Sequence, residues 1–394
     1  MSGVPGATGG PDPSLDLELI RERFEDAQDF TVAIEEEFAL LDPVTLELTD
    51  RFEELYAAAL GDDLLVDSVA GELIATEIEI RSGRAESFEE LIRFQQEHRN
   101  RLFELADGLG IALAAAGTHP WASYLDQRII DTPHYARLQE ELQWVAQRNN
   151  TWSVHVHMGI RGADRAIAVC DHVRGLLPAL LAASANSPFL DGKETGLHSV
   201  RSEIFTRTFP RCGIPEAFGS WEEYARFVDL LTQTRSIVES TQLWWSVRPH
   251  HAFGTIEVRI CDAQSRGDES LRLSALMAAC VAQSALDYDD GRLPPPLRDR
   301  EIEENVWRAI RYGLDGQMID FDRGEEVATR AAIEAIFNWS EPARTALALD
   351  AAPVEQNGAQ RLMAAIESGA TIADAYRSSV KETATTYTAE AVAG

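Results

Sequence analysis

The sequence predicts an α+β fold in which a mostly antiparallel sheet packs helices on one face and lines a cleft with the other. Segments that alternate like strands are separated by segments with helical periodicity. Several strand segments carry ionisable side chains on one face and Val, Ile or Phe on the other, whereas the strands of a doubly wound parallel sheet are apolar on both faces. From Asp268 onward the pattern is helical almost to the end, which predicts an α-rich C-terminal part.

The expected strands alternate between polar and apolar side chains. Residues 30–41, FTVAIEEEFALL, form the first of them. Asp42-Pro43 then begins a turn, after which Leu46 and Leu48 indicate a hairpin return. Further strands are expected at 73–81, 110–118, 151–160, 243–248 and 254–261.

The expected helices begin at recognisable caps. Ser87, with Glu90 three residues later, matches a capping box, and the helix that it opens is expected to stop at Gly108. A long apolar helix is expected over 164–185, kinked at Pro178 because proline removes a backbone donor. Further helices are expected at 132–148, at 220–242 and, as short amphipathic helices, after a break at 291–296.

Two segments differ from this regular order. Residues 1–15 are rich in Gly, Pro and Ser and are expected to be disordered, so that residues 16–394 form a single domain. Residues 186–219 contain several prolines and glycines and are expected to be a loop. Loops of this length inside compact domains tend to be functional.

The composition excludes several classes of protein. The 394 residues include 65 acidic and 35 basic side chains, so the formal charge is −30. Such a chain suits neither nucleic acid nor an anionic membrane surface, because both attract clustered cations. The sequence has no run of 18 apolar residues and no basic, apolar leader, so neither a membrane span nor a secretory signal is expected. Four cysteines without a C-x-x-C pair favour a reducing, cytoplasmic location.

Ionisable side chains occupy the middle of four expected strands. Residues two apart in a strand point to the same face. Carboxylates gathered on one face raise one another's pKa and are costly to bury, and a divalent cation relieves that repulsion. Four pairs share a face in this way: Glu35 with Glu37, Glu77 with Glu79, His155 with His157, and Glu257 with Arg259.

Each of these patterns, taken alone, usually has a structural explanation that involves no metal ion. E-x-E is usually a solvated sheet face, H-x-H a structural or surface pair, and E-x-R a cross-strand ion pair. Their repetition on separate strands favours a metal site, and its oxygen-rich donors suit Mg²⁺ or Mn²⁺ better than zinc. The sequence contains neither a dinucleotide-binding nor a P-loop motif. Arginines, whose guanidinium groups suit phosphate and carboxylate, cluster nearby at positions 201, 207, 211, 248 and 259.

Six segments together resemble a known family. They are FTVAIEEEFALLDP, ATEIEIRSGRAES, AAAGTHPWA, YARLQEELQWVAQRN, VHVHMGI and RPHHAFGTIEVRICD. With these segments, the sequence resembles the carboxylate–amine ligase branch of the glutamate–cysteine ligase type 2 family over roughly residues 30–350. The resemblance implies a glutamine-synthetase-like catalytic fold, in which the concave face of a curved antiparallel sheet holds ATP, two or three Mg²⁺ or Mn²⁺ ions and an acidic amino acid.

The resemblance also implies roles for individual residues. His157 would lie near the nucleotide phosphates, Arg259 would steady the transferring γ-phosphoryl group, and Arg201 and Arg248 would contact phosphate or carboxylate. Glu257 and Arg259 would be the catalytic residues. The implied metal ligands are Glu35, Glu37, Glu72, Glu79, His155 and Glu257. The sequence departs from the family pattern at Ala33 (often Gly), at Glu77 (often Gln) and at Ser82-Gly83 (usually Thr-Pro).

The implied activity is ATP-dependent amide-bond formation through an acyl phosphate. The family default is a weak ligation of L-glutamate to L-cysteine, with a homodimer whose contact the helices after residue 268 would supply. Two alternatives stay open at this point. One is a regulatory protein of the same fold that binds metal and nucleotide without catalysis, and the other is a metal-dependent hydrolase that uses the same carboxylates.

Overall fold

An antiparallel sheet forms the centre of the structure, a computed structural model that describes residues 15–389. Its strands follow the order β2-β3-β1-β5-β9-β8, and β4 pairs with the second half of β1. Every pairing in this sheet is antiparallel, as the sequence predicts. The strands are β1 (Val32–Leu41), β2 (Val69–Ala70), β3 (Glu77–Arg81), β4 (Ala112–Ala114), β5 (Val154–Gly159), β8 (Val247–His250) and β9 (Thr255–Val258).

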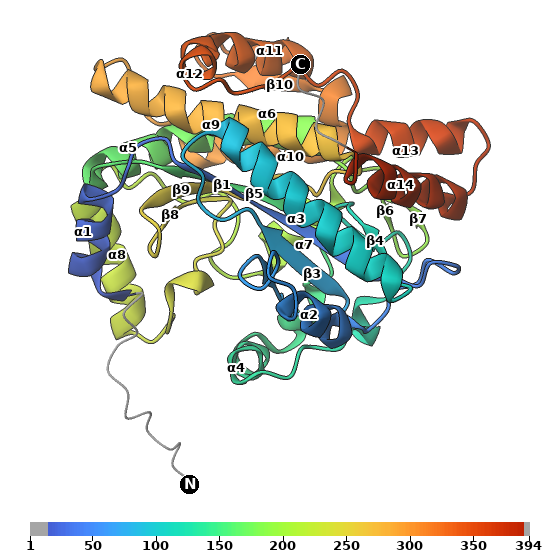
Figure 1. Ribbon diagram of the computed structural model, residues 1–394. Coiled ribbons are helices and arrows are strands. Elements are labelled where there is room, and N and C mark those ends of the chain that lie inside the picture. The colour runs from blue at the N-terminus through green and yellow to red at the C-terminus, as the bar shows by residue number, and fades with distance from the viewer. Residues whose placement is uncertain (1–14, 390–394) are drawn as a thin grey trace, which may run out of the picture.

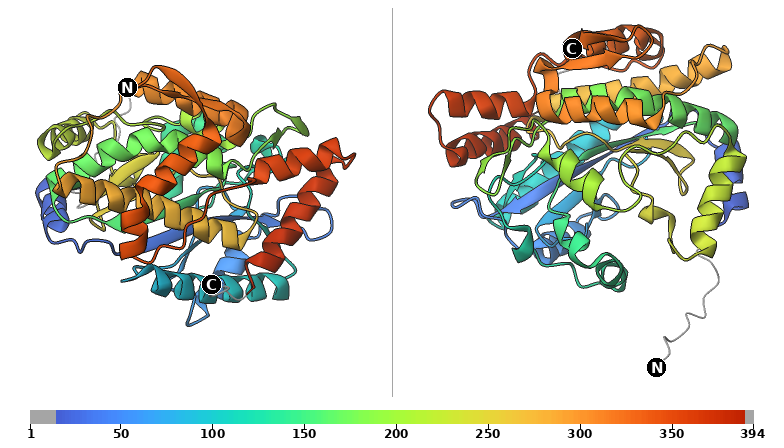
Figure 2. Two further views of the ribbon diagram at one scale, coloured as in Figure 1. Left: turned by 90° about the horizontal axis from the view of Figure 1, so that it is seen from above. Right: turned by 180° about the vertical axis from the view of Figure 1, so that it is seen from behind.

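Helices cover one face of this sheet in layers (Figure 1). Helices α3 (Phe88–Gly108), α5 (Ala163–Val173) and α9 (Gly267–Asp289) contact the strands directly. Helix α6 (Leu177–Ser184) packs against α9, and α10 (Asp299–Tyr312) packs against α6. Helices α11 (Thr329–Trp339) and α12 (Glu341–Ala346) lie outside them (Figure 2). The remaining helices are α1 (Leu17–Glu25), α2 (Phe52–Leu60), α4 (Pro133–Leu142), α7 (Val200–Thr208), α8 (Trp221–Gln233), α13 (Gly358–Glu367) and α14 (Ile372–Thr386).

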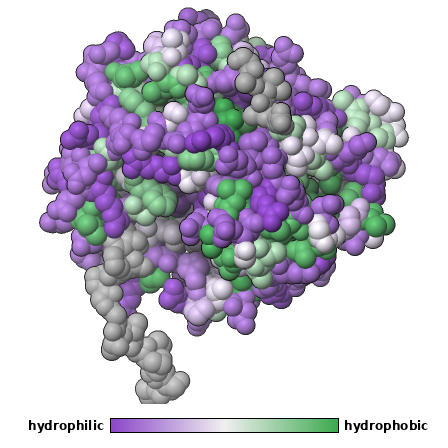
Figure 3. Space-filling view, in the orientation of Figure 1, coloured by the Kyte–Doolittle hydropathy of each residue, from purple (hydrophilic) through white to green (hydrophobic). Residues whose placement is uncertain are grey.

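The alternation in β1 decides which side chains enter the core. Ile34 and Phe38 are fully buried on the helix side, where they join two large apolar clusters. Glu35 and Glu37 point to the opposite face, because successive side chains of a strand alternate. The outer surface is largely hydrophilic on the side drawn in Figure 3, in keeping with a chain in which a quarter of the residues are charged.

Several element predictions are wrong at their boundaries. The hairpin return near Leu48 is a single bridge to Leu41, and the strand expected at 110–118 is only three residues long. The helix expected at 132–148 changes to a 3₁₀ helix after Leu142, and the helix expected at 220–242 ends at Gln233. Polar and glycine-rich flanks carry little periodic signal, so such ends are the least predictable part of a pattern.

One prediction about a whole segment is also wrong, and the helical C-terminal part contains a hairpin that the sequence did not predict. The expected loop at 186–219 contains the β6–β7 hairpin and helix α7, whose N-cap Ser199 accepts a hydrogen bond from the Ser202 backbone. The helical tail contains a second hairpin. These short strands are β6 (Phe189–Leu190) with β7 (Lys193–Glu194), and β10 (Gln317–Asp320) with β11 (Glu325–Ala328). The tail expected to be disordered lies outside the described residues, except for Leu15.

The long apolar segment breaks rather than bending smoothly. A 3₁₀ turn over Arg174–Leu176 separates α5 from α6, and Pro178 lies in the first turn of α6, where its missing donor costs nothing. By length and composition, residues 163–184 are the one described stretch that could cross a bilayer, but 78% of its most apolar window is buried inside the fold. The segment is therefore interpreted as a core helix pair.

A charged pair is buried beneath the sheet. Glu36, the one β1 glutamate that faces the helices, is 2% exposed and accepts hydrogen bonds from Arg99 of α3 and Ser270 of α9. Gln95 Nε2 donates to the same carboxylate at 2.6 Å, and the Arg99 guanidinium stacks on Tyr387 at 4.5 Å. Arg99 holds the pKa of Glu36 below its ordinary value against the opposing effect of burial. Through these contacts the pair links β1, α3 and α9 with Tyr387, which directly follows α14.

Arg99→Met is expected to lower the free energy of unfolding by about 3–5 kcal/mol, because it leaves an uncompensated charge in the core. Urea unfolding followed by circular dichroism measures the loss. The double variant Glu36→Gln/Arg99→Met should regain most of it, since no buried charge remains. A loss below about 1 kcal/mol in the single variant would contradict a role for the pair in stability.

Candidate functional site

The polar face of the sheet brings the predicted site residues into cross-strand rows. In one row, Glu257 lies opposite both His157 and Arg248. In the next, Glu35 lies between His155 and Arg81, and in the third, Glu37 lies opposite Glu79. Side chains directly opposite each other in an antiparallel pair are neighbours. Segments more than 200 residues apart in sequence therefore meet on one face.

Most of these side chains form the floor of a cavity of about 300 Å³, but His157 and Glu257 are not among its lining residues. Helix α4 contributes Tyr135, Leu138 and Leu142 to its walls, and helix α7 contributes Arg201 and Phe205. The floor is polar and the walls are partly apolar. Of the residues expected to hold metal or phosphate, the cavity is lined by Glu35, Glu37, Glu72, Glu79, His155, Arg201, Arg248 and Arg259.

Burial excludes the ordinary explanation of E-x-E as a solvated face. Glu37 is 7% exposed, Glu79 5% and Glu257 1%. Carboxylates this deeply buried need cations or hydrogen-bond donors close by. The two ends of the site meet that need in different ways.

At the β8–β9 end, arginines supply the positive charge. Arg248 Nε donates to Glu257 Oε2 at 2.6 Å, and Arg259 donates to the other carboxylate oxygen. Burial would raise the pKa of Glu257, but Arg248, Arg259 and His157 outweigh it and hold the pKa well below its ordinary value. Glu257 is therefore ionised and its two oxygens are fixed in direction.

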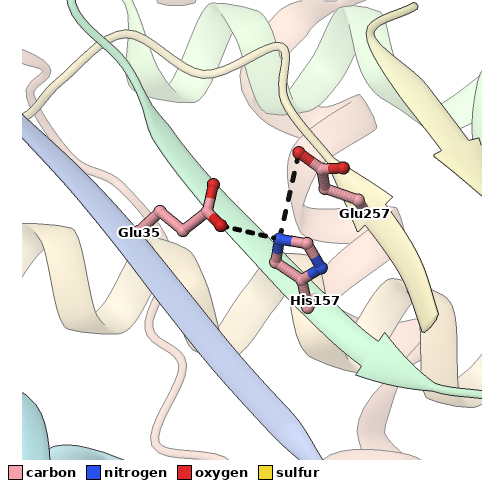
Figure 4. Close-up of side chains that lie close together, drawn as sticks. All are labelled: Glu35, His157 and Glu257. Atoms are coloured by element: carbon pink, nitrogen blue, oxygen red, sulfur yellow. Dashed lines mark ion pairs between the residues drawn. The ribbon is translucent and has the colours of Figure 1, made fainter. Parts of the chain in front are cut away.

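Between the two ends, Glu35, His157 and Glu257 point toward one another from three strands (Figure 4). His157 Nε2 lies 3.2 Å from Glu35 Oε1 and 3.9 Å from Glu257 Oε1, without an aligned hydrogen bond to either. His157 Nδ1 lies 3.0 Å from the Thr255 hydroxyl, which fixes the ring. The Nε2 atom thus faces two carboxylates, as a metal-ligating imidazole would.

At the β3 end, carboxylates outnumber their partners. Ser153 donates to Glu37 through its backbone at 2.5 Å and its hydroxyl at 2.7 Å. Burial, followed by the charge of Glu37, raises the pKa of Glu72 to about 8. Burial and neighbouring carboxylates also raise the pKa of Glu77 and of Glu79 well above the ordinary value. Without a cation, this end of the site retains protons at neutral pH.

Three clusters on the polar face of the sheet have a donor set that fits a divalent metal ion. In each cluster, one ligand atom from every residue lies within 4.8 Å of the others. Carboxylate oxygens with at most one imidazole suit Mg²⁺ or Mn²⁺, and the misaligned His157 Nε2 is an atom that such an ion would satisfy. The clusters are Glu35 with His157 and Glu257, Glu35 with Glu79 and His155, and Glu37 with Glu72 and Glu79.

The raised pKa of Glu72 predicts a pH dependence for the metal-free protein. Glu72 loses its proton near 4.5 in the unfolded chain but near 8 in the fold, so the folded protein binds more protons between these values. Stability contributed by this group must then fall as pH rises through that window. In urea unfolding with a chelator, the advantage of Glu72→Gln over the native chain should grow with pH and shrink when Mg²⁺ is added. Parallel pH curves for the two proteins would contradict this.

The roles assigned to the histidines and arginines stay predictions, and the structure shows which further contacts these residues make. Both histidines of the H-x-H strand belong to candidate metal clusters, so the assignment of His155 to metal and of His157 to phosphate stays a prediction. Arg201 donates to the carbonyls of Arg259 and Ile260, while its Nε is buried without a hydrogen-bond partner. Arg248 donates to the carbonyl of Leu243 as well as to Glu257, so in this structure it positions that carboxylate.

Sequence reasoning missed the walls of the cavity. Tyr135, whose hydroxyl donates to the Gly71 carbonyl at 2.5 Å, begins one of the six segments that carry the resemblance but was given no role, and Trp244 lies outside those segments. Phe205 was missed because α7 lies inside the segment that was expected to be a loop. Ser153 follows the strand alternation with His155, so the same face rule that selected the histidines could have found it.

Comparison with known proteins identifies a family. The model of "Glutamate-cysteine ligase family 2(GCS2)" matches residues 31–393. A protein of Rubrobacter xylanophilus named "Putative glutamate--cysteine ligase 2-2" is 39% identical over 319 residues, which cover 81% of this chain and 82% of that protein. A Sorangium cellulosum protein named "Putative glutamate--cysteine ligase 2" is 42% identical over 310 residues, which cover 79% of this chain and 82% of its own length.

Solved structures share the fold. The glutamate–cysteine ligase of Francisella tularensis, determined in complex with AMP, aligns with a TM-score of 0.67 at 10% identity and covers 92% of this chain and 90% of its own. A bifunctional glutathione synthetase of Pasteurella multocida aligns with a TM-score of 0.63 at 11% identity, over 94% of this chain and 54% of its own. The predicted α+β class, with its antiparallel sheet and helical C-terminal part, is thereby confirmed.

Proposed function

The chain belongs to glutamate–cysteine ligase family 2 and is an ATP-dependent carboxylate–amine ligase, and from this premise we propose that it joins L-glutamate to an amine through an acyl phosphate. L-Cysteine is the amine that the family name suggests, with weak activity. The observation that carries the proposal is the single buried face on which three candidate metal clusters lie beside two arginines.

The two ends of the site differ in the charged side chains that they present. Arg248 and Arg259 provide guanidinium groups at the β8–β9 end, which favours the anionic triphosphate there. At the opposite end, burial and neighbouring carboxylates raise the pKa of Glu72 and of Glu79, so a bound cation would favour their ionised forms, and the amine would bind on this side. The reacting carboxylate would lie between them, above Glu35. This order would place ATP, the phosphoryl donor, and the amine on opposite sides of the substrate's carboxyl carbon.

In the first step, an oxygen of the substrate carboxylate attacks the γ-phosphorus, the bond from phosphorus to the β,γ-bridging oxygen breaks, and ADP leaves. Arg259 would steady the transferring phosphoryl group, because catalysis of this kind is largely positioning and charge stabilisation. Mg²⁺ or Mn²⁺ held by the glutamates and histidines of the three clusters would neutralise the triphosphate.

In the second step, the amine nitrogen attacks the acyl carbon, the bond from that carbon to the phosphate oxygen breaks, and phosphate leaves with its electron pair. The nitrogen gives up the protons that the amide does not keep. Phosphorylation is needed because oxide is a poor leaving group whereas phosphate is a good one. The buried walls of the cavity would keep water from the acyl phosphate.

Release of ADP, measured with L-glutamate, a panel of amines and Mg²⁺ or Mn²⁺, tests the proposal. ADP formation that requires both the carboxylate and an amine supports ligation. Nucleotide binding without ADP release would instead favour the regulatory alternative. Consumption of the added substrates in the absence of ATP would favour the hydrolase.

A further inference from the structure

Glu77 is the one carboxylate on the cavity floor that the three metal clusters do not use. It is 1% exposed, and its Oε2 atom has no hydrogen-bond partner among the described residues. It lies opposite Ala39 in the β1–β3 pairing, two residues beyond the row of Glu37 and Glu79 and therefore on the same face. A buried carboxylate oxygen that faces a cavity without a partner requires a cationic or donor group from a ligand.

The surroundings of Glu77 favour an ammonium group over another metal ion. Next to it the cavity wall is apolar: Leu73, Leu138 and Phe209 belong to one packed cluster, and Tyr135, Phe205 and Trp244 lie against it. The carboxylates near Glu77, which are Glu37, Glu72 and Glu79, already form one candidate metal cluster, and the wall adds few oxygen ligands for a further ion, of which Mg²⁺ or Ca²⁺ requires about six. An ammonium group needs only a few acceptors, and aromatic rings also attract it.

We propose that Glu77 binds the ammonium group of the amine substrate and that the apolar wall receives that substrate's side chain. This inference rests on the proposed ligase function and specifies its second substrate as an amine that carries an apolar side chain larger than that of cysteine. Cysteine would fill only part of the wall, which would account for weak activity with it. The apolar wall consists of Leu73, Tyr135, Leu138, Leu142, Phe205, Phe209 and Trp244.

Binding measurements test the proposal independently of turnover. L-Alanine, L-cysteine and L-leucine are titrated calorimetrically into the protein with Mg²⁺ and a non-hydrolysable ATP analogue. The native chain should bind L-leucine about 10-fold or more tightly than L-alanine, because each added methylene in a fitted apolar pocket is worth roughly 10-fold. Glu77→Gln, which keeps the shape of the side chain, should weaken binding of all three by about 10-fold or more and leave nucleotide affinity unchanged.

Two further variants separate the parts of the proposal. Glu325→Gln, on the exposed strand β11, is the matched control and should bind like the native chain. Leu138→Asn should weaken L-leucine much more than L-alanine without changing nucleotide affinity. Thermal unfolding checks that each variant is folded, and if Leu138→Asn is not, Phe205→Gln takes its place.

Three results would overturn the inference. They are equal amino-acid affinity in Glu77→Gln and the native chain, a changed Mg²⁺ requirement in Glu77→Gln, and a loss of nucleotide rather than leucine affinity in the wall variant. Absence of ADP release with every amine, while the binding pattern holds, would instead refute the ligase function and leave the amine site supported.

Discussion

Glu257→Gln is expected to abolish ATP turnover, with a loss of about 10³-fold or more, in a chain that still folds. Glu257 belongs to a candidate metal cluster and is held by Arg248 and Arg259, so its charge and direction are both fixed. The amide keeps the volume but removes the anionic oxygen that a hard cation requires, and its NH₂ group would face two guanidinium groups. ADP release under saturating Mg²⁺ measures the loss.

Glu269→Gln is the matched control for this experiment. Glu269 of α9 also pairs with an arginine, Arg361 of α13, at 2.7 Å, but it belongs to none of the three candidate metal clusters. That variant should retain native turnover. Full turnover in Glu257→Gln would show that the carboxylate is not a ligand, and a collapse of its thermal unfolding temperature would indicate a structural role.

Arg259→Ala is expected to lower kcat by about 10³-fold or more, by analogy with the arginines that stabilise phosphoryl transfer in other enzymes. Arg259 follows β9 directly and lies 3.4 Å from His155 Nδ1, so its guanidinium reaches the centre of the candidate site. Burial lowers the pKa of Arg259, but Glu257 and other carboxylates outweigh this effect and raise it, so the charge is permanent. Steady-state ATP kinetics measure the change.

A loss of transition-state stabilisation can be separated from a loss of binding. The variant should keep its KM for ATP within a few-fold while kcat falls, and added guanidinium ion should restore part of the rate. The kcat and KM of Arg259→Ala are compared with those of Arg248→Ala. Arg248 also pairs with Glu257, but it donates to the carbonyl of Leu243 as well. A kcat within about 10-fold of the native value in Arg259→Ala would remove the residue from the mechanism.

Local alternation determined much of this site in advance. In a strand the side-chain period is two, so the sequence alone placed Glu35 with Glu37 and His155 with His157 on common faces. The same rule assigned Glu36 to the opposite side, where the structure pairs it with Arg99. The antiparallel sheet also followed from these strands, since one-sided polarity does not suit a parallel sheet.

Only the tertiary structure decided which faces meet. Strand order and register bring Glu257 beside His157 and Glu79 beside Glu37, and no local pattern encodes pairing between segments so far apart. The structure likewise decided that these carboxylates are buried, that α7 supplies a wall, and that Glu77 stands outside every metal cluster. Periodicity depends on neighbouring residues in the chain, whereas charge, burial and cavity shape arise from contacts that form only when distant segments pack together.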